Sequence, residues 1–388
     1  MSAPLVLVAN ARMPSQRAQS LQVAQMAAAF ERAGAPTTLV HALRRDTPAV
    51  DDPDSLWDHY AVPEGARPGV EGVSCVDWID CVPRALQYIP ARLQELSFAR
   101  RAARAVERGH EGARALCREV ETAHALGRRA GVFLEIHRVP GGRARRRWLC
   151  EAAARAAGTV AISSGVRDDL VELGLDGSKI LVEHDGFEPE RFQGLPDKAD
   201  AREKLGLDPA RPTIVYSGGL LGWKGVDVLV EAARGLEGVC VVIAGGMDAD
   251  VAELKRRAAG IENVRIDGFQ PPGRVGLYLA AADLGVVPNR SSPPISSHYT
   301  SPLKVFESMA VGLPLVCSDL PSLRDVLGED EAYFVPPDDP AELREGLRRA
   351  LTDEAGRRDR AERLRTRARA HSWGARARRI LDWMEARG

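Results

Sequence analysis

Short apolar runs alternate with helical patterns along most of this 388-residue chain. Strands that alternate with helices of roughly 10–15 residues form parallel sheets, because each helix carries the chain back to the same end of the sheet. The alternation therefore predicts an α/β fold. The expected strands are 5–9, 38–40, 132–136, 159–162, 180–182, 213–217, 239–244, 264–267, 284–287, 315–317 and 332–335. The expected helices are 21–30, 94–108, 143–157, 165–174, 226–234, 251–259, 274–281 and 302–310, with a helical segment at 339–387.

The alternation is interrupted once near the middle of the chain. Residues 188–211 break the apolar rhythm, and the pattern then restarts. We expect a linker there, a domain boundary between residues 190 and 191, and two Rossmann-like domains that face a central cleft. Residues 44–95 are interpreted as a long irregular insert. Arg118-Glu119 and Asp185-Gly186 are interpreted as a surface pair and a turn.

The net charge of −1 gives no global attraction to nucleic acid or to membranes. Residues 84–147, however, contain 15 Arg and 6 Glu. This local excess is either a set of solvated helix faces or a basic face for an anionic acceptor or for anionic lipid headgroups. The stretch lacks the interleaved aromatic residues of single-strand platforms, so no nucleic-acid partner is expected.

The six cysteines show neither CxxC nor zinc-ligand spacing. We therefore expect reduced, mostly buried thiols and a cytoplasmic protein. No apolar run reaches the roughly 18 residues of a membrane-spanning helix, so any membrane contact is expected to be peripheral, at the inner face.

A glycine-rich turn follows the expected strand 213–217. It reads Y-S-G-G-L-L-G-W-K-G and covers residues 216–225. Glycines between a strand and a helix let backbone amides approach a phosphate closely, and Lys224 adds a mobile cation. The spacing is not that of a Walker A loop. The alternative is a plain glycine turn with a solvent-facing lysine.

A second motif, Y-T-S-P-L-K-V-F-E-S-M-A-V-G-L-P-L-V-C-S, covers residues 299–318. Ser301 is a good residue for starting a helix, and the amides of Leu303 and Lys304 would then point at a ligand. A helix N-terminus after a strand is a frequent phosphate site in α/β proteins, and Glu307 lies where a ribose would be read. The motif predicts a nucleotide-diphosphate ligand. The alternative is an ordinary ion pair between Lys304 and Glu307, which share a helix face.

Polar residues also follow two expected strands of the first half. His137 comes directly after the strand 132–136, where open α/β sheets place ligands, although a structural histidine is the alternative. Arg12, Ser15 and Arg17 follow the first strand and are candidates for contact with an acceptor.

Together these segments resemble glycosyltransferase family 4, the retaining sugar-nucleotide transferases with the GT-B fold. The resemblance covers most of the chain. In the second half it lies in Y-S-G-G-L-L-G-W-K-G-V-D-V-L-V-E-A-A, V-V-I-A-G-G, V-R-I-D-G-F and S-P-L-K-V-F-E-S-M-A-V-G-L-P-L-V. In the first half it lies in V-A-I-S-S-G-V-R-D-D-L and H-D-G-F-E-P-E-R-F.

The resemblance implies a role for each domain. Residues 1–190 would bind the acceptor, residues 191–372 would bind the nucleotide sugar, and a last helix, 373–388, would cross back to the first domain. Lys224 matches the family lysine that binds the diphosphate, and Glu307 matches the acid that binds the ribose hydroxyl groups. His137 matches a histidine near the transferred sugar, so His137 and Lys224 are the expected catalytic residues. The implied donor-binding residues are Gly218, Gly219, Lys224, Gly245, Phe269, Ser301, Leu303, Lys304 and Glu307.

Two positions depart from the family pattern. An arginine is frequent where this chain has Gly219, and the first acid of the E-x7-E motif is replaced by Tyr299. Lys304 is a candidate for the missing positive charge. We interpret the departures as variation within a subset of the family that carries S-P-L-K-x-F-E, and not as inactivation.

The implied activity is transfer of a hexosyl group from a UDP- or GDP-linked sugar to a glycan, lipid-linked or small-molecule acceptor in glycan or cell-envelope synthesis. Retention of configuration follows from the resemblance. No metal and no cofactor are expected, because Lys224, backbone amides and a helix dipole can stabilise the leaving diphosphate. The alternatives are a GT-B nucleotide-sugar epimerase, for which no convincing acid–base set is present, and a non-catalytic nucleotide-sugar-binding protein.

Overall fold

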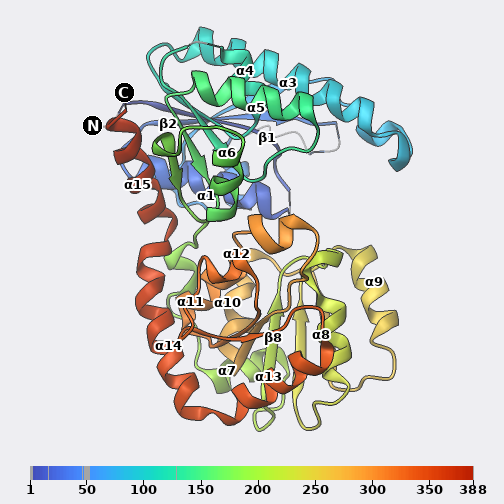
Figure 1. Ribbon diagram of the computed structural model, residues 1–388. Helices are drawn as coiled ribbons and strands as arrows, with labels where there is room; N and C mark the ends of the chain where they lie inside the picture. The colour runs from blue at the N-terminus through green and yellow to red at the C-terminus, as the bar shows by residue number, and fades with distance from the viewer. Residues whose placement is uncertain (1–2, 16, 46, 48–52, 128, 388) are drawn as a thin grey trace. The chain divides into compact units, whose positions relative to one another are not determined.

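The structure is a computed structural model that describes residues 3–15, 17–45, 47, 53–127 and 129–387 (Figure 1). The chain divides into two compact units. The first contains Met1–Glu183 and Trp373–Gly388, and the second contains His184–Ser372. The chain thus leaves the first unit after Glu183 and returns to it at Trp373.

The first unit is built on a sheet of seven parallel strands in the order β3-β2-β1-β4-β5-β6-β7. The strands are β1 Leu5–Arg12, β2 Thr37–Leu43, β3 Gly69–Ser74, β4 Arg114–Cys117, β5 Val132–Ile136, β6 Gly158–Ala161 and β7 Ile180–Val182. The central strands are buried on both faces, as expected where helices cover both sides of a parallel sheet.

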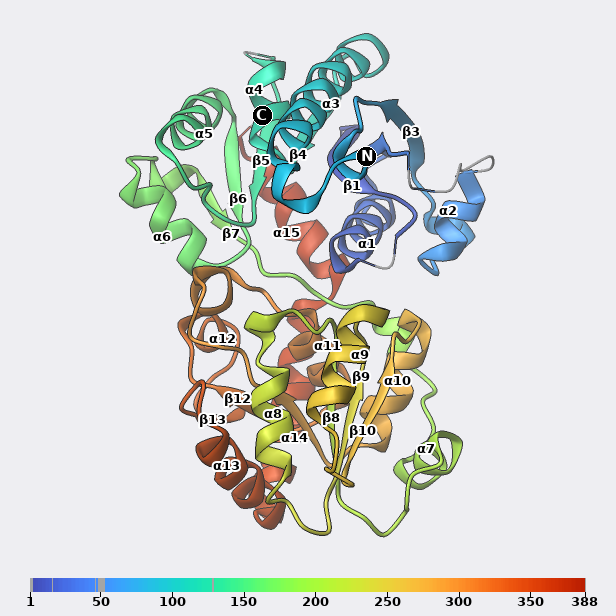
Figure 2. The ribbon, with the colours of Figure 1, turned by 90° about the vertical axis from the view of Figure 1, so that its right-hand side faces the viewer.

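The helices of this unit lie on the two faces of the sheet (Figures 1 and 2). They are α1 Ala18–Arg32, α2 Pro53–His59, α3 Tyr88–Gly109, α4 Val120–Leu126, α5 Arg143–Arg155, α6 Ser164–Glu172 and α15 Trp373–Glu385. Figure 1 shows α3, α4 and α5 side by side on one face, while α15 packs against α1. The last helix therefore completes the sheet's second face.

The register of α15 explains why it packs there. Its buried residues Trp373, Ala377, Ile380 and Met384 recur at helical spacing and form one apolar face. The ring of Trp383 lies over Gly158, where a Cβ atom would come within 2.2 Å of the indole. Only a glycine at this point of β6 leaves room for the tryptophan.

The second unit is built on six parallel strands in the order β10-β9-β8-β11-β12-β13. The strands are β8 Thr213–Ser217, β9 Cys240–Ala244, β10 Val264–Gly268, β11 Leu284–Val287, β12 Leu315–Ser318 and β13 Ala332–Val335. The helices are α7 Lys198–Leu205, α8 Val226–Ala233, α9 Asp248–Arg257, α10 Pro272–Ala281, α11 Leu303–Val311, α12 Pro321–Arg324, α13 Pro340–Thr352 and α14 Glu354–Ala368. Separate apolar clusters fill the spaces between sheet and helices.

Two segments are more regular than the sequence predicts. The expected insert 44–95 contains α2, the edge strand β3 and the start of α3, although residues 46 and 48–52 lie outside the described part. The expected linker 188–211 contains α7, whose Ala201 and Leu205 join a core cluster. The apolar residues of these segments do not recur at a sustained strand or helix period, so their regular structure depends on packing against the sheets and gives a weak sequence pattern.

The burial of the cysteines differs from the expectation of mostly buried thiols. Only Cys117 and Cys317 are buried, while Cys81 is exposed and the other three cysteines are half-buried. Among the described residues, none of the helices combines the length and the apolar character that crossing a bilayer requires.

Candidate functional site

The strand order of the second unit creates a crevice between two adjacent strands. The chain moves outward from β8 in one direction and from β11 in the other, so the connections after these two strands diverge. Such a switch point at the carboxyl ends of parallel strands is where open α/β sheets bind ligands. Both predicted motifs, the glycine-rich turn and the segment 299–318, follow these two strands. The structure therefore brings them together.

The two loops are held together by hydrogen bonds to one backbone carbonyl and by a close backbone approach. The Arg290 N–H donates to the Trp223 carbonyl at 2.9 Å, and the Ser296 hydroxyl donates to the same oxygen at 3.2 Å. Gly225 has φ +65°, and a Cβ atom there would lie 1.8 Å from the Pro288 carbonyl oxygen. The turn after β8 is thus fixed against the loop after β11.

Gly218 and Gly245 let the turns after β8 and β9 touch. The Gly218 N–H donates to the Ala244 carbonyl at 2.9 Å, and the Gly245 N–H donates to the Gly268 carbonyl at 2.6 Å. Gly245 has φ +127°, and a Cβ atom there would lie 2.2 Å from the Gly218 carbonyl oxygen. A side chain at Gly245 would therefore displace the glycine-rich turn.

We expect Gly245→Ala to weaken nucleotide binding by about tenfold and to destabilise the protein by roughly 1–3 kcal/mol, through backbone strain and displacement of the turn. Isothermal titration with UDP and GDP, together with a thermal melt, measures both effects. Gly238→Ala is the matched control, because Gly238 also has positive φ, at +72°, but open space at its Cβ position. Equal affinity in the two variants would contradict this role of Gly245.

Lys304 is the most unusual residue of the site. Its side chain, on the first turn of α11, is 8% exposed. Its Nζ lies 3.5 Å from the centroid of the Tyr216 ring and has no hydrogen-bond partner among the described residues. Burial and the neighbouring Lys224 hold the pKa of Lys304 well below its usual value, against an opposing effect of Glu307. A buried cation without a counter-charge is costly unless a ligand supplies an anion.

Lys224 adds a second positive charge to the same place. It ends the short helical turn Gly222–Lys224, and a Cβ atom on Gly219 would lie 3.8 Å from its Nζ. Burial lowers the pKa of Lys224. Lys224 and Lys304 are close enough for repulsion to matter, so the free site favours an anion.

Glu307 lies one helical turn beyond Lys304, and its side chain is 13% exposed. Burial raises the pKa of its carboxyl group, against the opposing charges of Arg191 and Lys304. Arg191 Nη2 is 3.6 Å from Glu307 Oε1. No ion pair between Lys304 and Glu307 is found in the described residues, so the simple salt-bridge alternative is not supported.

The remaining predicted donor residues lie at the beginning of α11 and at the end of β10. Ser301 lies just before α11, where its hydroxyl oxygen accepts a hydrogen bond from the Asp185 N–H at 2.8 Å. Asp185 is itself buried rather than part of an exposed turn. Leu303 is the first residue of α11, and Phe269 follows β10 with 37% of its surface exposed. Tyr299 is the last residue of a short π-helical turn, Ile295–Tyr299, and is half-buried.

In the part of the chain that the structure describes, no group of three or more His, Cys, Asp or Glu side chains is placed to hold a metal ion. Asp248 and Asp250, which follow the glycine turn after β9, lie in the first turn of α9. Acidic residues stabilise a helix N-terminus, which accounts for both side chains.

The first unit holds a separate buried charge cluster around Glu135. His137 Nε2 lies 2.6 Å from Glu135 Oε1 and 2.9 Å from Arg118 Nη2. Arg376 of α15 donates from Nη2 to Glu135 Oε2 at 3.2 Å. Burial alone would raise the pKa of Glu135, but Arg376, His137 and Arg118 hold it well below its usual value. The side chain of His137 remains 30% exposed, so it can reach a ligand.

Arg118 and Glu119 are not the surface pair that the sequence predicts. The side chain of Arg118 is 7% exposed and contacts His137. Glu119 accepts the Asn10 N–H at 2.8 Å through Oε1, while its Oε2 has no hydrogen-bond partner among the described residues. Burial raises the pKa of Glu119 to about 7. The error came from missing β4, whose carboxyl end turns both side chains inward.

The predicted acceptor residues lie at the carboxyl end of β1. Arg12 ends that strand and pairs with Asp80 at 2.7 Å. The Ser15 N–H donates to the Tyr60 hydroxyl at 2.8 Å. Arg17 is exposed, but partial desolvation of its guanidinium group and the nearby charges of Arg12 and Arg44 lower its pKa. Several guanidinium groups therefore share this end of the sheet.

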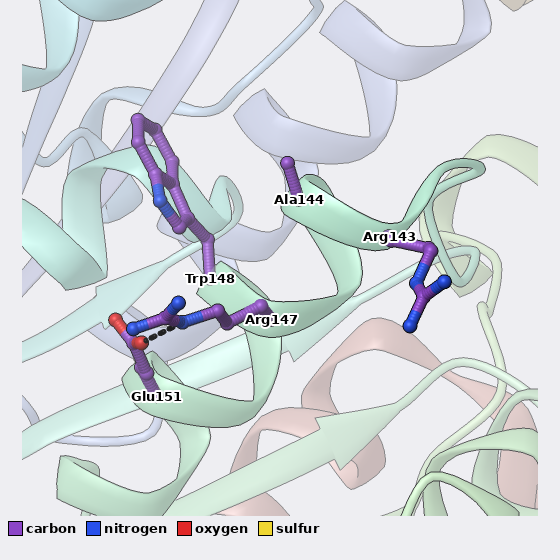
Figure 3. A pocket seen from close by; sticks show the side chains of 5 residues that line it. All are labelled: Arg143, Ala144, Arg147, Trp148 and Glu151. Carbon is purple, nitrogen blue, oxygen red and sulfur yellow. Dashed lines mark hydrogen bonds and ion pairs between the residues drawn. The ribbon is translucent and has the colours of Figure 1, made fainter.

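The outer side of α5 carries a shallow basic pocket (Figure 3). Arg147 pairs with Glu151 at 2.7 Å, and Arg143 points away from that pair. Trp148 stacks on His124 with a centroid distance of 5.2 Å. The pocket lies on the outer helix layer, far in sequence from the predicted donor residues.

Comparison with known proteins relates this geometry to a family. Residues 197–371 match the family model described as glycosyl transferases group 1. These residues contain β8 to β13 and the two loops of the switch point. They form a group 1 glycosyltransferase domain.

Two curated relatives of this chain carry the name of glycosyltransferases. The chain is 29% identical over 282 residues to D-inositol 3-phosphate glycosyltransferase of Nocardia farcinica, covering 68% of this chain and 60% of that protein. It is 27% identical over 200 residues to the putative teichuronic acid biosynthesis glycosyltransferase TuaC of Bacillus subtilis, covering 51% of this chain and 48% of that protein. The chain thus spans about half to three fifths of the length of these relatives.

A solved structure is similar in fold to nearly the whole chain, and not only to the glycosyltransferase domain. Anabaena Alr3699/HepE in complex with UDP matches 99% of this chain and 100% of its own, with a TM-score of 0.76 and 16% identity. This likeness concerns the fold alone. The prediction of two Rossmann-like, parallel-sheet domains of the GT-B class is confirmed. The prediction of a transferase enzyme is supported by the family match over residues 197–371.

The sequence predicted the glycine turn and the start of α11 as parts of the site. It did not predict the contact of Arg191 with Glu307 or the charge cluster around Glu135. Arg191, beside Glu307, lies in the segment taken for a linker. Glu135 precedes His137, but its partner Arg376 comes from α15, 241 positions away. A charged residue within the apolar strand β5 was the only sequence signal for that cluster.

Proposed function

We propose that this protein transfers a sugar from a UDP- or GDP-linked donor to an acceptor. The observation that carries the proposal is the buried Lys304, whose Nζ lacks a hydrogen-bond partner among the described residues beside a second lysine. A diphosphate supplies the anion that these lysines lack. The proposal agrees with the HepE structure, in which that protein is in complex with UDP.

Each donor-binding residue has a proposed task. The backbone of Gly218, Gly219 and Leu303 faces the diphosphate, and Lys224 and Lys304 neutralise it. Glu307 accepts hydrogen bonds from the ribose hydroxyl groups. Gly245, Phe269 and Ser301 shape the surroundings of the nucleotide.

The proposed reaction is a front-face transfer with retention of configuration. As the bond from sugar to phosphate breaks, negative charge grows on the leaving diphosphate, and the two lysines and the α11 N-terminus stabilise it without a metal. The leaving phosphate takes the proton of the acceptor hydroxyl. A covalent glycosyl adduct on a side chain, detected by mass spectrometry after donor incubation, would overturn this scheme, and activity abolished by EDTA would contradict metal independence.

We propose that the first unit binds the acceptor, a glycan, a lipid-linked sugar or a small molecule of cell-envelope or glycoconjugate synthesis. Arg12, Ser15 and Arg17 are the proposed contacts, and His137 is a proposed catalytic residue. The six free cysteines fit a cytoplasmic location, and the basic surface of the first unit fits peripheral contact with an anionic membrane.

Transfer should depend on two residues of the second unit. We expect Lys224→Ala and Glu307→Ala each to lower transfer by about 100-fold or more, the usual effect of losing one transition-state donor or anchor. Radiolabelled UDP- and GDP-sugars with extracted glycolipid acceptors provide the assay. Lys255→Ala and Glu237→Ala, at exposed positions of the same unit, are the controls.

The same assay separates the alternatives. Tight donor binding without any transfer or donor hydrolysis would favour a nucleotide-sugar sensor. Appearance of an epimer from UDP-N-acetylglucosamine alone would favour an epimerase. Full activity in both Lys224→Ala and Glu307→Ala would refute the proposed site.

Nucleotide binding should be coupled to protonation. Because burial lowers the pKa of free Lys304, a bound diphosphate that restores its charge makes the complex take up a proton. We expect the affinity for UDP or GDP to fall by about tenfold per pH unit as pH rises above the lowered pKa of the free lysine. Titration calorimetry in two buffers of different ionisation enthalpy measures the uptake, and Lys304→Met should abolish the uptake. A pH-independent affinity would contradict the coupling.

A further inference from the structure

The first unit exposes a group of large apolar side chains at the beginning of α3. We call Trp78, Leu86, Tyr88, Ile89 and Leu93 the apolar patch. Their exposed fractions are 54, 65, 71, 68 and 43%. They make up half of the ten large apolar side chains that are exposed among the described residues. Such a concentration on a folded surface marks a binding surface.

Two short helical turns bring Trp78 and Leu86 next to α3. Trp78 precedes the turn Ile79–Cys81, Leu86 ends the turn Arg84–Leu86, and both turns contact α3. Figure 1 shows this end of α3 projecting from the helix layer of the first unit. The patch is therefore accessible to a broad, flat partner.

Arginines continue the same helix face. Ile89, Leu93, Arg100 and Arg104 follow one another at spacings of four, seven and four residues, which places them on one side of the helix. The opposite side, with Phe98, is buried. Neither Arg100 nor Arg104 has an ion-pair or hydrogen-bond partner among the described residues, and both are exposed. One exposed face thus carries apolar residues at one end and unpaired positive charge further along.

We propose that the apolar patch and this arginine pair dock the protein on the surface of an anionic lipid bilayer. Trp and Tyr favour the membrane–water interface, and amphipathic helices with basic polar residues bind there. Protein interfaces, by contrast, are depleted of unpaired charge at their core. The α5 residues Arg143 and Arg146 add exposed positive charge to the same helix layer. The proposal rests on the peripheral membrane contact included in the proposed function and assigns that contact to α3, but it does not depend on the donor site.

The test is sedimentation of the full chain with vesicles, in the absence of nucleotide. We expect binding to phosphatidylcholine vesicles that contain 30% phosphatidylglycerol (about one lipid in three, enough for the surface potential that attracts basic segments), and much weaker binding to phosphatidylcholine alone. The double variant Ile89→Asp, Leu93→Asp should lower the partition coefficient by at least about tenfold, because it removes inserted apolar surface and adds repulsion. Arg100→Gln with Arg104→Gln should lower it by about tenfold and reduce its salt dependence.

Matched variants separate docking from general effects. Val171→Asp replaces a 41% exposed apolar residue of α6 in the same unit, and Arg358→Gln removes an arginine whose side chain is 74% exposed on α14. Both should bind vesicles like the unmodified protein. Brominated acyl chains should quench the fluorescence of Trp78, and Trp78→Phe should remove that quenching.

Three results would overturn the proposal. The first is equal binding of the Ile89→Asp, Leu93→Asp variant and of Val171→Asp. The second is binding that is equally strong on vesicles without phosphatidylglycerol. The third is a dimer in sedimentation velocity that the same double variant dissociates while vesicles are not bound, which would assign the patch to a second copy of the chain.

Discussion

Lys304→Met is expected to stabilise the free protein while nearly abolishing nucleotide binding. The pKa of Lys304 is lowered in the folded state, so this residue opposes folding wherever the unfolded lysine is protonated, and the cost fades only as pH rises toward the unfolded value. Methionine has a similar length, packs on Tyr216 and needs no counter-charge. We expect a gain of about 1 kcal/mol or more in the free energy of unfolding and a loss of about 100-fold or more in affinity for UDP or GDP.

Thermal melts with and without nucleotide measure both parts of this prediction. The free variant should melt at a higher temperature than the unmodified protein, and added nucleotide should no longer raise its melting temperature. Lys255→Met, an exposed position on α9, should change neither quantity. A variant that melts lower and still binds nucleotide normally would show that Lys304 is a structural residue.

Glu135→Gln is expected to cause the largest loss of stability in the first unit. The amide keeps the shape of the carboxylate but leaves the buried Arg376 without its counter-charge. Breaking a buried ion pair from one side costs roughly 3–5 kcal/mol. Because the pKa of Glu135 is lowered on folding, this stability is present above about pH 4.5 and is lost as pH falls through the lowered pKa.

Chemical denaturation across a pH series checks this expectation, since the difference between the two proteins should shrink in acid. The double variant Glu135→Leu, Arg376→Met should recover much of the lost stability, because it leaves no unpaired charge. Glu183→Gln is the comparison, since its partner Arg379 is 43% exposed and water can solvate the freed charge. An equal loss from Glu135→Gln and Glu183→Gln would contradict the special role of the Glu135 cluster.

The sequence predicted the fold where periodicity is strong and missed it where packing decides. The apolar strands β8 and β11 were placed to the residue, because their runs are bounded by turn residues. The edge strand β3, with the sequence G-V-E-G-V-S, has too few apolar residues to be recognised. The helix α7 is mostly charged, and only its contact with the core through Leu205 gives it a place.

The sequence predicted some features of the candidate site and could not predict others, for the same reason. Lys224, Lys304 and Glu307 were predicted because they lie in short motifs at strand ends. Their burial and the missing partner of the Lys304 Nζ could not be predicted, because both depend on Tyr216 and on the neighbouring turns. Arg376 was missed because nothing in its local sequence distinguishes it from the other arginines of the last helices.

The return of α15 to the first unit has a consequence for biosynthesis. A ribosome completes the entire second unit before it makes α15, yet α15 supplies Arg376 to Glu135 and the tryptophan that lies on Gly158. Domains generally fold as they emerge. For this chain we expect the opposite order of completion: the second unit closes first. The first unit waits, with one face of its sheet only partly covered, until its last helix has been synthesised.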